Sequence, residues 1–486
     1  SGSFGVVHKV TQTSSGLERV MKTINKDNAI SSGTPLGMLK QEIDMLCLLD
    51  HPNILRLFEW YNDSQNVYLI LDACSGGELL DLISDSAEKQ WPLPEAWLER
   101  IFFQSLEAIG YCHSKGVMHK DLKFENIMLQ KRLTAGSRLE DVEAVVIDVG
   151  LAELFGPQHG KQSRSNQRAG SLATMAPEVL MGDFSYKCDI WSLGCMIFAV
   201  YNSQPFNIPA PNGGEMLYMY PFFPQATNED PMGVNSMLAV QKQGPPMQLL
   251  QTSNPALLEL VSAMLQFQEQ QRPDAATCLT SSWFGGAQSP VDGVLEGSAG
   301  RGALRFAKEQ LFGLLAERES RLCWRAALLQ AASQLPAAKI QPLARLFHEM
   351  DVDKSGFLDQ CELVAGLRRL GVSDEAAQQA AAAADFDGNG KIEYTEFVAG
   401  CLPVASELFA VSLQAAFQAF DSDNDGAIDS TELSALLQSG QISGADMPQS
   451  KAVESMLAEL DSDHNGRISF PEFHDYFIHA DANFRM

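Results

Sequence analysis

The stretch that decides the fold reads His119-Lys120-Asp121-Leu122-Lys123-Phe124-Glu125-Asn126. Its Asp121 carboxylate can accept a hydroxyl proton, its Lys123 can stabilise a transferred phosphoryl group, and its Asn126 amide can hold a metal ion. The combination of these three groups at this spacing is specific for phosphoryl transfer, because each group has a separate role in that reaction. The segment therefore predicts a catalytic loop.

A second carboxylate follows this loop. Asp148 opens an Asp148-Val149-Gly150 turn directly behind the apolar run 145–147. Together with Asn126, Asp148 would hold Mg²⁺ between the phosphates of a nucleotide. An Asp-x-Gly sequence alone is usually a plain turn, so this interpretation depends on the order of the surrounding motifs.

Two segments upstream supply the nucleotide end. Gly2-Ser3-Phe4-Gly5-Val6-Val7 fits the end of a G-x-G-x-x-G-x-V loop, whose glycines let backbone N–H groups approach phosphates. A glycine turn in a hairpin is the plainer interpretation of that stretch. Lys22 ends a strand-like run and Glu42 lies on an amphipathic helix, so the two can pair and direct the lysine toward phosphates. Gly2, Gly5, Val7 and Lys22 are the predicted nucleotide contacts here.

Three downstream motifs complete the series: Ala176-Pro177-Glu178, the run 189–194 and Arg272-Pro273. Glu178 and Arg272 are predicted to form a buried ion pair. In this order the motifs resemble the eukaryotic protein kinase fold over residues 1–284. The resemblance implies a bilobal α+β domain, with a β-rich N-lobe and an α-rich C-lobe.

The kinase resemblance assigns further roles. It implies that Leu71 is the gatekeeper, that Asp72 and Cys74 offer hinge backbone groups to adenine, and that Glu78 meets the ribose of ATP. Lys123 and Ser171 match the serine/threonine branch, with tyrosine specificity as the alternative. Protein substrates would carry Ser or Thr with upstream basic residues, which Glu78 and Glu125 would attract.

A different pattern recurs four times after residue 341. A helix, an acidic loop and a helix follow one another, with loops that begin at Asp351, Asp385, Asp421 and Asp461. Each loop has the oxygen ligands, the central glycine and the final glutamate of a Ca²⁺-binding EF-hand, and the alternative is an EF-hand that keeps its fold without metal. The predicted ligands are Asp351, Asp353, Ser355, Phe357, Asp359 and Glu362; Asp385, Asp387, Asn389, Lys391, Glu393 and Glu396; Asp421, Asp423, Asp425, Ala427, Asp429 and Glu432; and Asp461, Asp463, Asn465, Arg467, Ser469 and Glu472.

The whole chain is similar to the calcium-dependent protein kinases of plants and protists. We expect a kinase domain at 1–284, a linker and junction helix at 285–340, and an all-α calmodulin-like part with EF-hand pairs at 341–400 and 401–486. The resemblance implies that the junction helix, residues 301–335, restrains the kinase until calcium fills the EF-hands. A solvated spacer helix is the alternative for that segment.

Four positions depart from the usual kinase pattern: Lys120, Phe124, Val149 and Thr174. The departures at Val149 and Lys120 motivate the alternative function, a calcium sensor or scaffold with an inactive kinase domain. That alternative is the poorer one, because pseudokinases lose reacting groups that this chain keeps. The groups kept are Lys22, Asp121, Asn126 and Asp148.

The amino-acid composition limits which ligands and which cellular compartment we expect for this protein. With 35 basic and 61 acidic residues the net charge is minus 26, which argues against nucleic acid and favours cations. Nine scattered cysteines indicate a reducing compartment, so we expect a cytoplasmic protein. No run approaches the roughly 18 apolar residues of a membrane span, so we expect it to be soluble. The glycine motif starts at Ser1 without its first glycine, so we expect membrane contact only through a segment before it, if at all.

Overall fold

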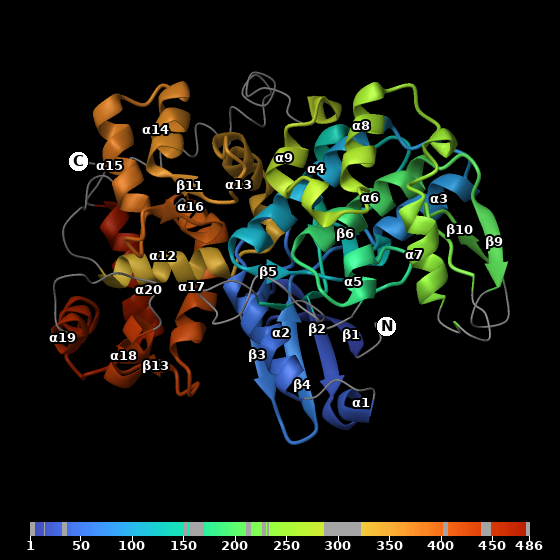
Figure 1. The fold of residues 1–486 in the computed structure, drawn as a ribbon. Helices are drawn as coiled ribbons and strands as arrows, with labels where there is room; N and C mark the ends of the chain where they lie inside the picture. The colour runs from blue at the N-terminus through green and yellow to red at the C-terminus, as the bar shows by residue number, and fades with distance from the viewer. Residues whose placement is uncertain are drawn as a thin grey trace.

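The computed structural model describes residues 5–13, 15–31, 36–149, 153–154, 170–209, 215–225, 230, 233–285, 322–401, 407–438 and 449–482. Gly2, Gly150, most of the predicted linker and the first part of the junction segment lie outside the described residues. Figure 1 shows a small β-rich lobe, a larger and mainly helical lobe, and a mainly helical C-terminal region on the left of the view. The predicted fold class is confirmed.

The small lobe is built on one antiparallel sheet with the strand order β1-β2-β4-β3. Alternate residues of β4, Val67, Leu69 and Leu71, are buried, because side chains alternate between the two faces of a strand. Helix α2 covers this lobe with Leu39, Ile43 and Leu46 on one buried face. The elements are β1 (Val6–Thr11), β2 (Glu18–Asn25), α1 (Lys26–Ser31), α2 (Leu36–Leu48), β3 (Leu57–Asn62) and β4 (Asn66–Leu71).

The large lobe surrounds two buried helices. Helix α6 (Lys187–Tyr201) has almost no exposed face, and α4 (Glu95–Ser114) buries most of its length. Among the described residues, no helix is long and apolar enough to span a membrane. The other elements are α3 (Leu79–Glu88), β5 (Val117–Met118), β6 (Ile127–Leu129), β7 (Ala144–Val146), β8 (Glu153–Leu154), α5 (Pro177–Met181), β9 (Phe206–Pro209), β10 (Glu215–Tyr218), α7 (Val234–Lys242), α8 (Pro255–Met264) and α9 (Ala275–Leu279).

The C-terminal region contains two pairs of helix-loop-helix units. The loops of each pair are joined by a short antiparallel ladder, which pairs Leu358 with Ile392 and Ile428 with Ile468. The elements are α12 (Leu322–Ser333), α13 (Ala337–Met350), β11 (Leu358–Asp359), α14 (Gln360–Arg369), α15 (Asp374–Ala384), β12 (Lys391–Ile392), α16 (Tyr394–Cys401), α17 (Glu407–Phe420), β13 (Ala427–Ile428), α18 (Ser430–Gln438), α19 (Gln449–Leu460), β14 (Ile468–Ser469) and α20 (Phe470–Ala482).

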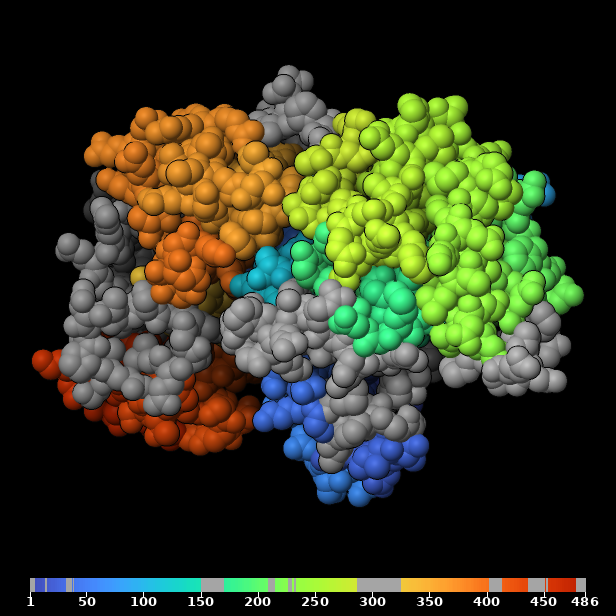
Figure 2. Space-filling view, viewed as in Figure 1, coloured from blue at the N-terminus to red at the C-terminus, as the bar shows by residue number. Residues whose placement is uncertain are grey.

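Helix α12 lies between the two pairs of EF-hands, packed on α16 of the first pair and on α17 of the second. Its alanines and leucines 326–329, 331 and 332 are all buried. The first pair also lies directly against the large lobe, as the space-filling view shows (Figure 2). The C-terminal region is therefore held to the N-terminal domain by packing as well as by the covalent chain.

Candidate active site and calcium loops

The predicted catalytic loop gathers its polar groups around Asp121. Lys123 Nζ donates to Asp121 Oδ2 at 2.7 Å, and the Asn126 amide donates to the Asp121 carbonyl at 2.7 Å. The other carboxylate oxygen, Oδ1, accepts both the N–H and the hydroxyl of Ser171 at 2.9 Å. Lys123, Asn126 and Ser171 therefore all contact one buried residue, Asp121.

Asp189 holds the backbone before this carboxylate. Its two oxygens accept the N–H groups of His119 at 3.0 Å and of Lys120 at 2.8 Å, and His113 Nε2 lies 2.9 Å from Oδ2. Lys120 has a left-handed backbone, with φ of +68°, which these bonds help to maintain. The sequence singled out the 189–194 run but gave no role to Asp189 or His113, because the contact depends on how distant segments pack.

Gly170 makes a close backbone approach to the same loop. A Cβ at this position would lie 2.3 Å from the Lys120 carbonyl oxygen, and the glycine has a φ of +106°. Both conditions demand glycine. Ser171 therefore follows a turn that presses onto the catalytic loop, which explains how its hydroxyl reaches Asp121.

An ion pair crosses the small lobe beside this loop. Lys22 Nζ lies 3.1 Å from Glu42 Oε1 on α2 and 3.9 Å from Asp148 Oδ1. Burial alone would lower the pKa of Lys22, but the two carboxylates outweigh burial and the pKa is raised. Lys22 thus stays charged, and the ion pair that the sequence permitted is formed.

The two predicted magnesium ligands flank two paired short strands: Asn126 directly precedes β6, and Asp148 lies two residues after β7. The Ile147 N–H donates to the Asn126 carbonyl at 2.9 Å, so Asp148 follows at the end of that pairing. Asp148 has a left-handed φ of +63°. An amide oxygen and a carboxylate are oxygen donors, the chemistry that Mg²⁺ prefers, and the residues present therefore fit this ion.

The predicted adenine end lies where β4 leaves the small lobe. Val7 pairs with Lys22 across β1 and β2, and a Cβ on Gly5 would lie 2.6 Å from the Thr23 carbonyl oxygen. Burial raises the pKa of the Cys74 thiol to about 12, so this group stays neutral. The other predicted contacts are Leu71, which is buried at the end of β4, Asp72, whose side chain is buried, and Glu78, which precedes α3.

The predicted ion pair of Glu178 and Arg272 is confirmed. Two nitrogens of Arg272 donate to the two oxygens of Glu178 at 2.5 and 3.0 Å, a bidentate arrangement in a buried place. The guanidinium also lies 5.1 Å from the centroid of the Trp191 ring. The pair fixes the segment that follows Ser171 against α6.

Two of the unusual residues fill apolar space. Phe124 is 1% exposed and stacks on Tyr220, with ring centroids 5.8 Å apart. Val149 is 2% exposed and joins the core of the N-terminal domain. The departures at these two positions are accommodated by packing, and they leave the polar groups of the site in place.

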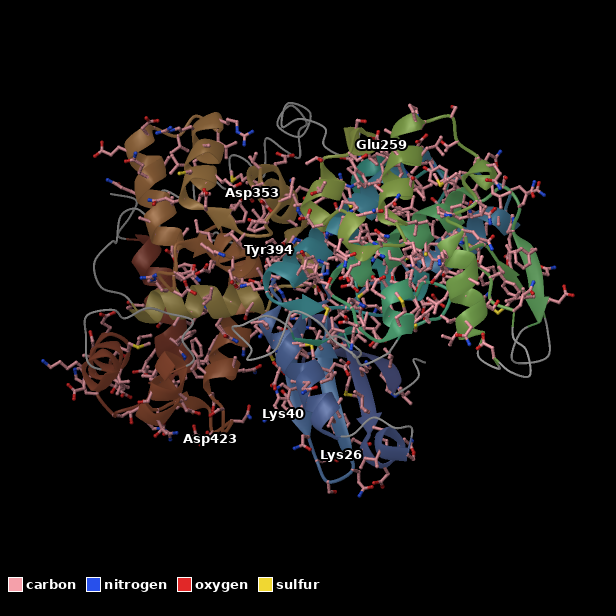
Figure 3. The ribbon with its side chains drawn as sticks, in the orientation of Figure 1. Lys26, Lys40, Glu259, Asp353, Tyr394 and Asp423 are labelled. Carbon is pink, nitrogen blue, oxygen red and sulfur yellow. The ribbon has the colours of Figure 1, made fainter. Side chains whose placement is uncertain are left out.

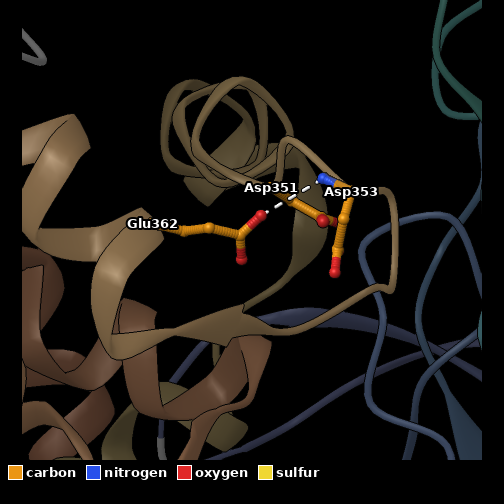
Figure 4. A group of neighbouring side chains, drawn as sticks. All are labelled: Asp351, Asp353 and Glu362. Carbon is orange, nitrogen blue, oxygen red and sulfur yellow. Dashed lines mark hydrogen bonds between the residues drawn. The ribbon is translucent and has the colours of Figure 1, made fainter.

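The carboxylates of each EF-hand loop converge. In every loop the ligand atoms of positions 1, 3 and 12 lie within 4.8 Å of one another. Figure 4 shows this group in the first loop, where the Asp353 N–H donates to Glu362 Oε1 at 3.2 Å. An all-oxygen cluster of this kind fits Ca²⁺. The groups are Asp351, Asp353 and Glu362; Asp385, Asp387 and Glu396; Asp421, Asp423 and Glu432; and Asp461, Asp463 and Glu472.

In the first pair, burial disfavours the charged form of two carboxylates of these clusters. It raises the pKa of Asp351 to about 7 and that of Glu396 to about 8, although backbone N–H donors act in the other direction. In the second pair, hydrogen bonds to Ser469 and Ser462 lower the pKa of Glu472 to about 2 against a burial effect that raises it.

Two arginines contact the loops in ways that the sequence did not predict. Arg467 of the fourth loop forms an ion pair with Asp425, a predicted ligand of the third. Arg325 of α12 donates to the carbonyls of Asp385 at 3.0 Å and Phe386 at 2.6 Å, at the start of the second loop. Arg325 belongs to the predicted junction helix, whose Arg318 and Arg321 lie outside the described residues.

The first two loops dock on one face of α4, which we call the α4 stripe and define as Phe103, Glu107 and Tyr111 of the helix with Lys115 at its C-cap. These residues are four positions apart and share one side of the helix. From the first loop, Lys354 Nζ lies 3.2 Å from Glu107 Oε1 and 5.6 Å from the Phe103 ring.

The fit at this docking surface is close. A Cβ on Gly356 would lie 2.5 Å from Tyr111 Cδ2. From the second loop, Glu393 forms an ion pair with Lys115 at the end of the α4 stripe. His348 Nδ1 lies 3.3 Å from Glu107 Oε2. Burial would raise the pKa of Glu107, but His348 and Lys354 lower it to about 2, so this carboxylate is charged.

A second contact joins the first pair to the end of α2. Asp50 accepts the Thr395 N–H at 2.7 Å and the Thr395 hydroxyl at 2.8 Å, which caps α16. Arg56 donates to the same hydroxyl at 3.2 Å and to Asp50 at 3.1 Å. Tyr394 beside them lies at the boundary between the two regions (Figure 3).

Comparisons with known proteins agree with this arrangement. The family model described as protein kinase domain matches residues 1–284, and that described as EF-hand domain pair matches 340–402 and 411–478. Calcium-dependent protein kinase 34 of Arabidopsis thaliana is 30% identical over 478 residues, covering 97% of this chain and 81% of that protein. Calcium-dependent protein kinase 3 of Plasmodium berghei is 28% identical over 478 residues, covering 97% and 77%. Calcium-dependent protein kinase 2 of Zea mays is 28% identical over 479 residues, covering 97% and 83%.

Proposed function

The chain belongs to the calcium-dependent protein kinases, and on that premise we propose that it transfers the γ-phosphate of ATP to Ser and Thr hydroxyls of proteins when calcium fills its EF-hands. One observation carries the proposal. Asp121 is surrounded by Lys123, Asn126 and Ser171, while Lys22 is paired with Glu42 in the same domain. Both halves of a phosphoryl-transfer site are therefore assembled.

The proton of the substrate hydroxyl is the first requirement. Asp121 would accept it, because its carboxylate lies in the catalytic loop, where one oxygen contacts the Ser171 hydroxyl and the other contacts Lys123. Burial would lower the pKa of Lys123, but its hydrogen bond to Asp121 raises it, so the lysine remains a cation for the transferred group. Lys123 would then stabilise the charge on the phosphoryl oxygens.

The nucleotide is held from the opposite side. Lys22, fixed by Glu42, would bind its phosphates, and Asn126 and Asp148 would hold Mg²⁺. When bound, Mg²⁺ neutralises charge that develops between the phosphates. Because α2 carries Glu42, any movement of α2 changes the position of Lys22.

Calcium would act through the docked first pair. The Asp50 contact ties α16 to the end of α2, and the α4 stripe receives the first two loops. We propose that the junction helix, residues 301–335, restrains the kinase until calcium binding favours this docked arrangement. A change from about 1% to 99% activity needs about 5.5 kcal/mol of differential calcium binding, which several cooperating sites can supply.

Substrate choice would depend on acidic groups beside the catalytic loop. Burial, Asp81 and Glu125 raise the pKa of Glu78, so the carboxylates of this group lie close enough to repel one another. A basic side chain upstream of the target hydroxyl would relieve that repulsion. This supports peptides of the Arg-x-x-Ser type as substrates.

The test is phosphate transfer from Mg-ATP to an Arg-x-x-Ser peptide across a calcium titration. Wild-type activity should rise in the range of regulatory EF-hands, about 10⁻⁷ to 10⁻⁵ M calcium. Asp121→Asn should lose transfer and keep calcium binding. Equal activity with chelator would rule out calcium control, and activity that is absent at any calcium would favour the sensor or scaffold.

A further inference from the structure

The turn between α12 and α13 is docked on the small lobe by charges of both signs. The last carbonyls of α12 face two arginines. Arg56 donates to the carbonyls of Ala332 at 3.3 Å and Ser333 at 3.4 Å. Arg19, which is 2% exposed, donates to the Gln334 carbonyl at 2.5 Å. Cations at this end match the negative end of the helix dipole.

An acidic side chain meets the other helix of the turn. Asp72 Oδ2 accepts the Ala337 N–H at 2.7 Å, at the first residue of α13. A carboxylate here matches the positive end of that helix. Asp72 is 5% exposed, so the hydrogen bond is shielded from water and joins residues 265 positions apart in the chain.

Asp72 also belongs to the connection between the two lobes of the kinase domain. It follows β4 directly, its N–H donates to the Arg56 carbonyl at 3.0 Å, and its Oδ1 accepts the Ala73 N–H at 2.8 Å. One side chain therefore contacts α13 with one oxygen and the backbone of this connection with the other. The backbone groups of Asp72 and Cys74 are those predicted to face adenine.

We propose that Asp72 is a positioning residue that couples docking of the α12–α13 turn to nucleotide binding. Its carboxylate, fixed by the Ala337 N–H, holds the backbone from Asp72 to Cys74 in the form that receives adenine. Undocking frees the carboxylate, and the nucleotide then binds more weakly. The inference rests on the proposed function, since it concerns the nucleotide of that reaction.

The coupling must work in both directions. If docking of the turn strengthens nucleotide binding, a bound nucleotide strengthens docking by the same factor. Helix α13 leads directly into the first calcium loop at Asp351. The nucleotide and the first EF-hand are therefore connected by one helix, without any contact through the catalytic loop.

The test removes the donor without altering the kinase domain. Ala337→Pro deletes the N–H that Asp72 accepts, at the first position of a helix, where proline is well tolerated. The preceding Pro336 has a ψ of 138°, which suits a residue before proline. The matched control is Asp374→Pro at the first position of α15, after Ser373 with a ψ of 153°. Helix α15 lies on the side away from the kinase domain (Figure 1).

Two quantities are measured at saturating calcium. Calorimetry gives the affinity for Mg-ADP, and steady-state kinetics gives KM for ATP and kcat separately. We expect Ala337→Pro to weaken Mg-ADP binding and raise KM about fivefold or more, the lower end of typical coupling, with kcat nearly unchanged. Asp374→Pro should match wild type. Equal affinities for the two proline variants would overturn the proposal.

A second variant keeps the test decisive. Asp72→Ala removes the acceptor of both the Ala337 and the Ala73 N–H groups. Adding Ala337→Pro to it should weaken nucleotide binding no further, because the one hydrogen bond that Ala337→Pro deletes is already lost. If the effects of the two substitutions on nucleotide affinity multiply, the proposal is overturned.

If Ala337→Pro does not fold, Asp72→Asn replaces it, since an amide offers one acceptor oxygen in place of two. Calorimetry needs no transfer, so a wild type that binds Mg-ADP without activity would contradict the proposed function alone.

Discussion

The two pairs of EF-hands share one fold and one ligand pattern, yet their loops contact different partners. In the first pair, Lys354 reaches Glu107 and Glu393 reaches Lys115, both on the α4 stripe of the kinase domain. In the second pair, Arg467 of one loop contacts Asp425 of the other. The loops of the first pair thus contact the kinase domain. In the second pair the two loops contact each other, and α17 packs on α12.

Part of the difference arises at position 4 of the loop, which is not a predicted ligand position. Position 4 of the loop is Lys354 in the first, Asn424 in the third and His464 in the fourth, all with a left-handed φ of 57° to 59°. The backbone conformation is the same, and in the first loop, which lies against α4, this position carries the lysine that pairs with Glu107. A substitution at position 4 can therefore change the contact with the kinase domain while the calcium ligands are preserved. Matched substitutions in the two pairs can test this difference.

The largest expected effect comes from the glycine at position 6. Gly356→Ala and Gly466→Ala both place a side chain at a φ of 82° to 84°, at a common cost of about 1–2 kcal/mol. Only the first also drives a Cβ into Tyr111, which adds about 1–3 kcal/mol. We expect Gly356→Ala to require at least tenfold more calcium for half-maximal transfer than Gly466→Ala. Equal requirements would mean that the first loop does not dock on Tyr111.

A smaller effect is expected at position 4. Lys354→Gln leaves the buried Glu107 with His348 alone, a loss of about 1–2 kcal/mol once the partial exposure of Lys354 is considered. His464→Gln in the fourth loop is the control. Transfer measured across a calcium titration should shift to higher calcium for Lys354→Gln and stay close to wild type for the control. A larger shift in the control would reverse the roles assigned to the two pairs.

The smallest effect is expected at position 11. Thr395→Val removes the hydroxyl that donates to Asp50 and keeps the N–H, a loss of about 0.5–1 kcal/mol. Thr431→Val makes the same change at the same position of the third loop. The thermal midpoint in calcium should fall slightly more for Thr395→Val. Identical midpoints would show that the N–H alone caps α16.

The sequence predicted much of the fold and the active site because the chemistry is encoded locally. Asp121, Lys123 and Asn126 lie in one loop, and each EF-hand carries its ligands within twelve consecutive residues. The Glu178 and Arg272 pair was also predictable, from the order of known motifs. Patterns of this kind do not depend on how distant segments pack.

The docking contacts could not be predicted in this way. Lys354 looks like an ordinary solvated lysine in a loop, and Glu107 like an exposed helical glutamate, until tertiary packing brings them together. Asp72 was predicted for its backbone alone, because nothing local indicates that its side chain meets Ala337. Contacts between regions join residues hundreds of positions apart, and single-sequence patterns carry no information about them.

The most direct measurement of the central claim is phosphate transfer across a calcium titration with one pair disabled at a time. Glu362→Gln with Glu396→Gln disables the first pair, and Glu432→Gln with Glu472→Gln disables the second. The first double variant should stay at the activity of the chelated wild type, while the second should still be activated, although at higher calcium. Full activation of the first double variant would contradict the claim that calcium acts on the kinase through the docked first pair.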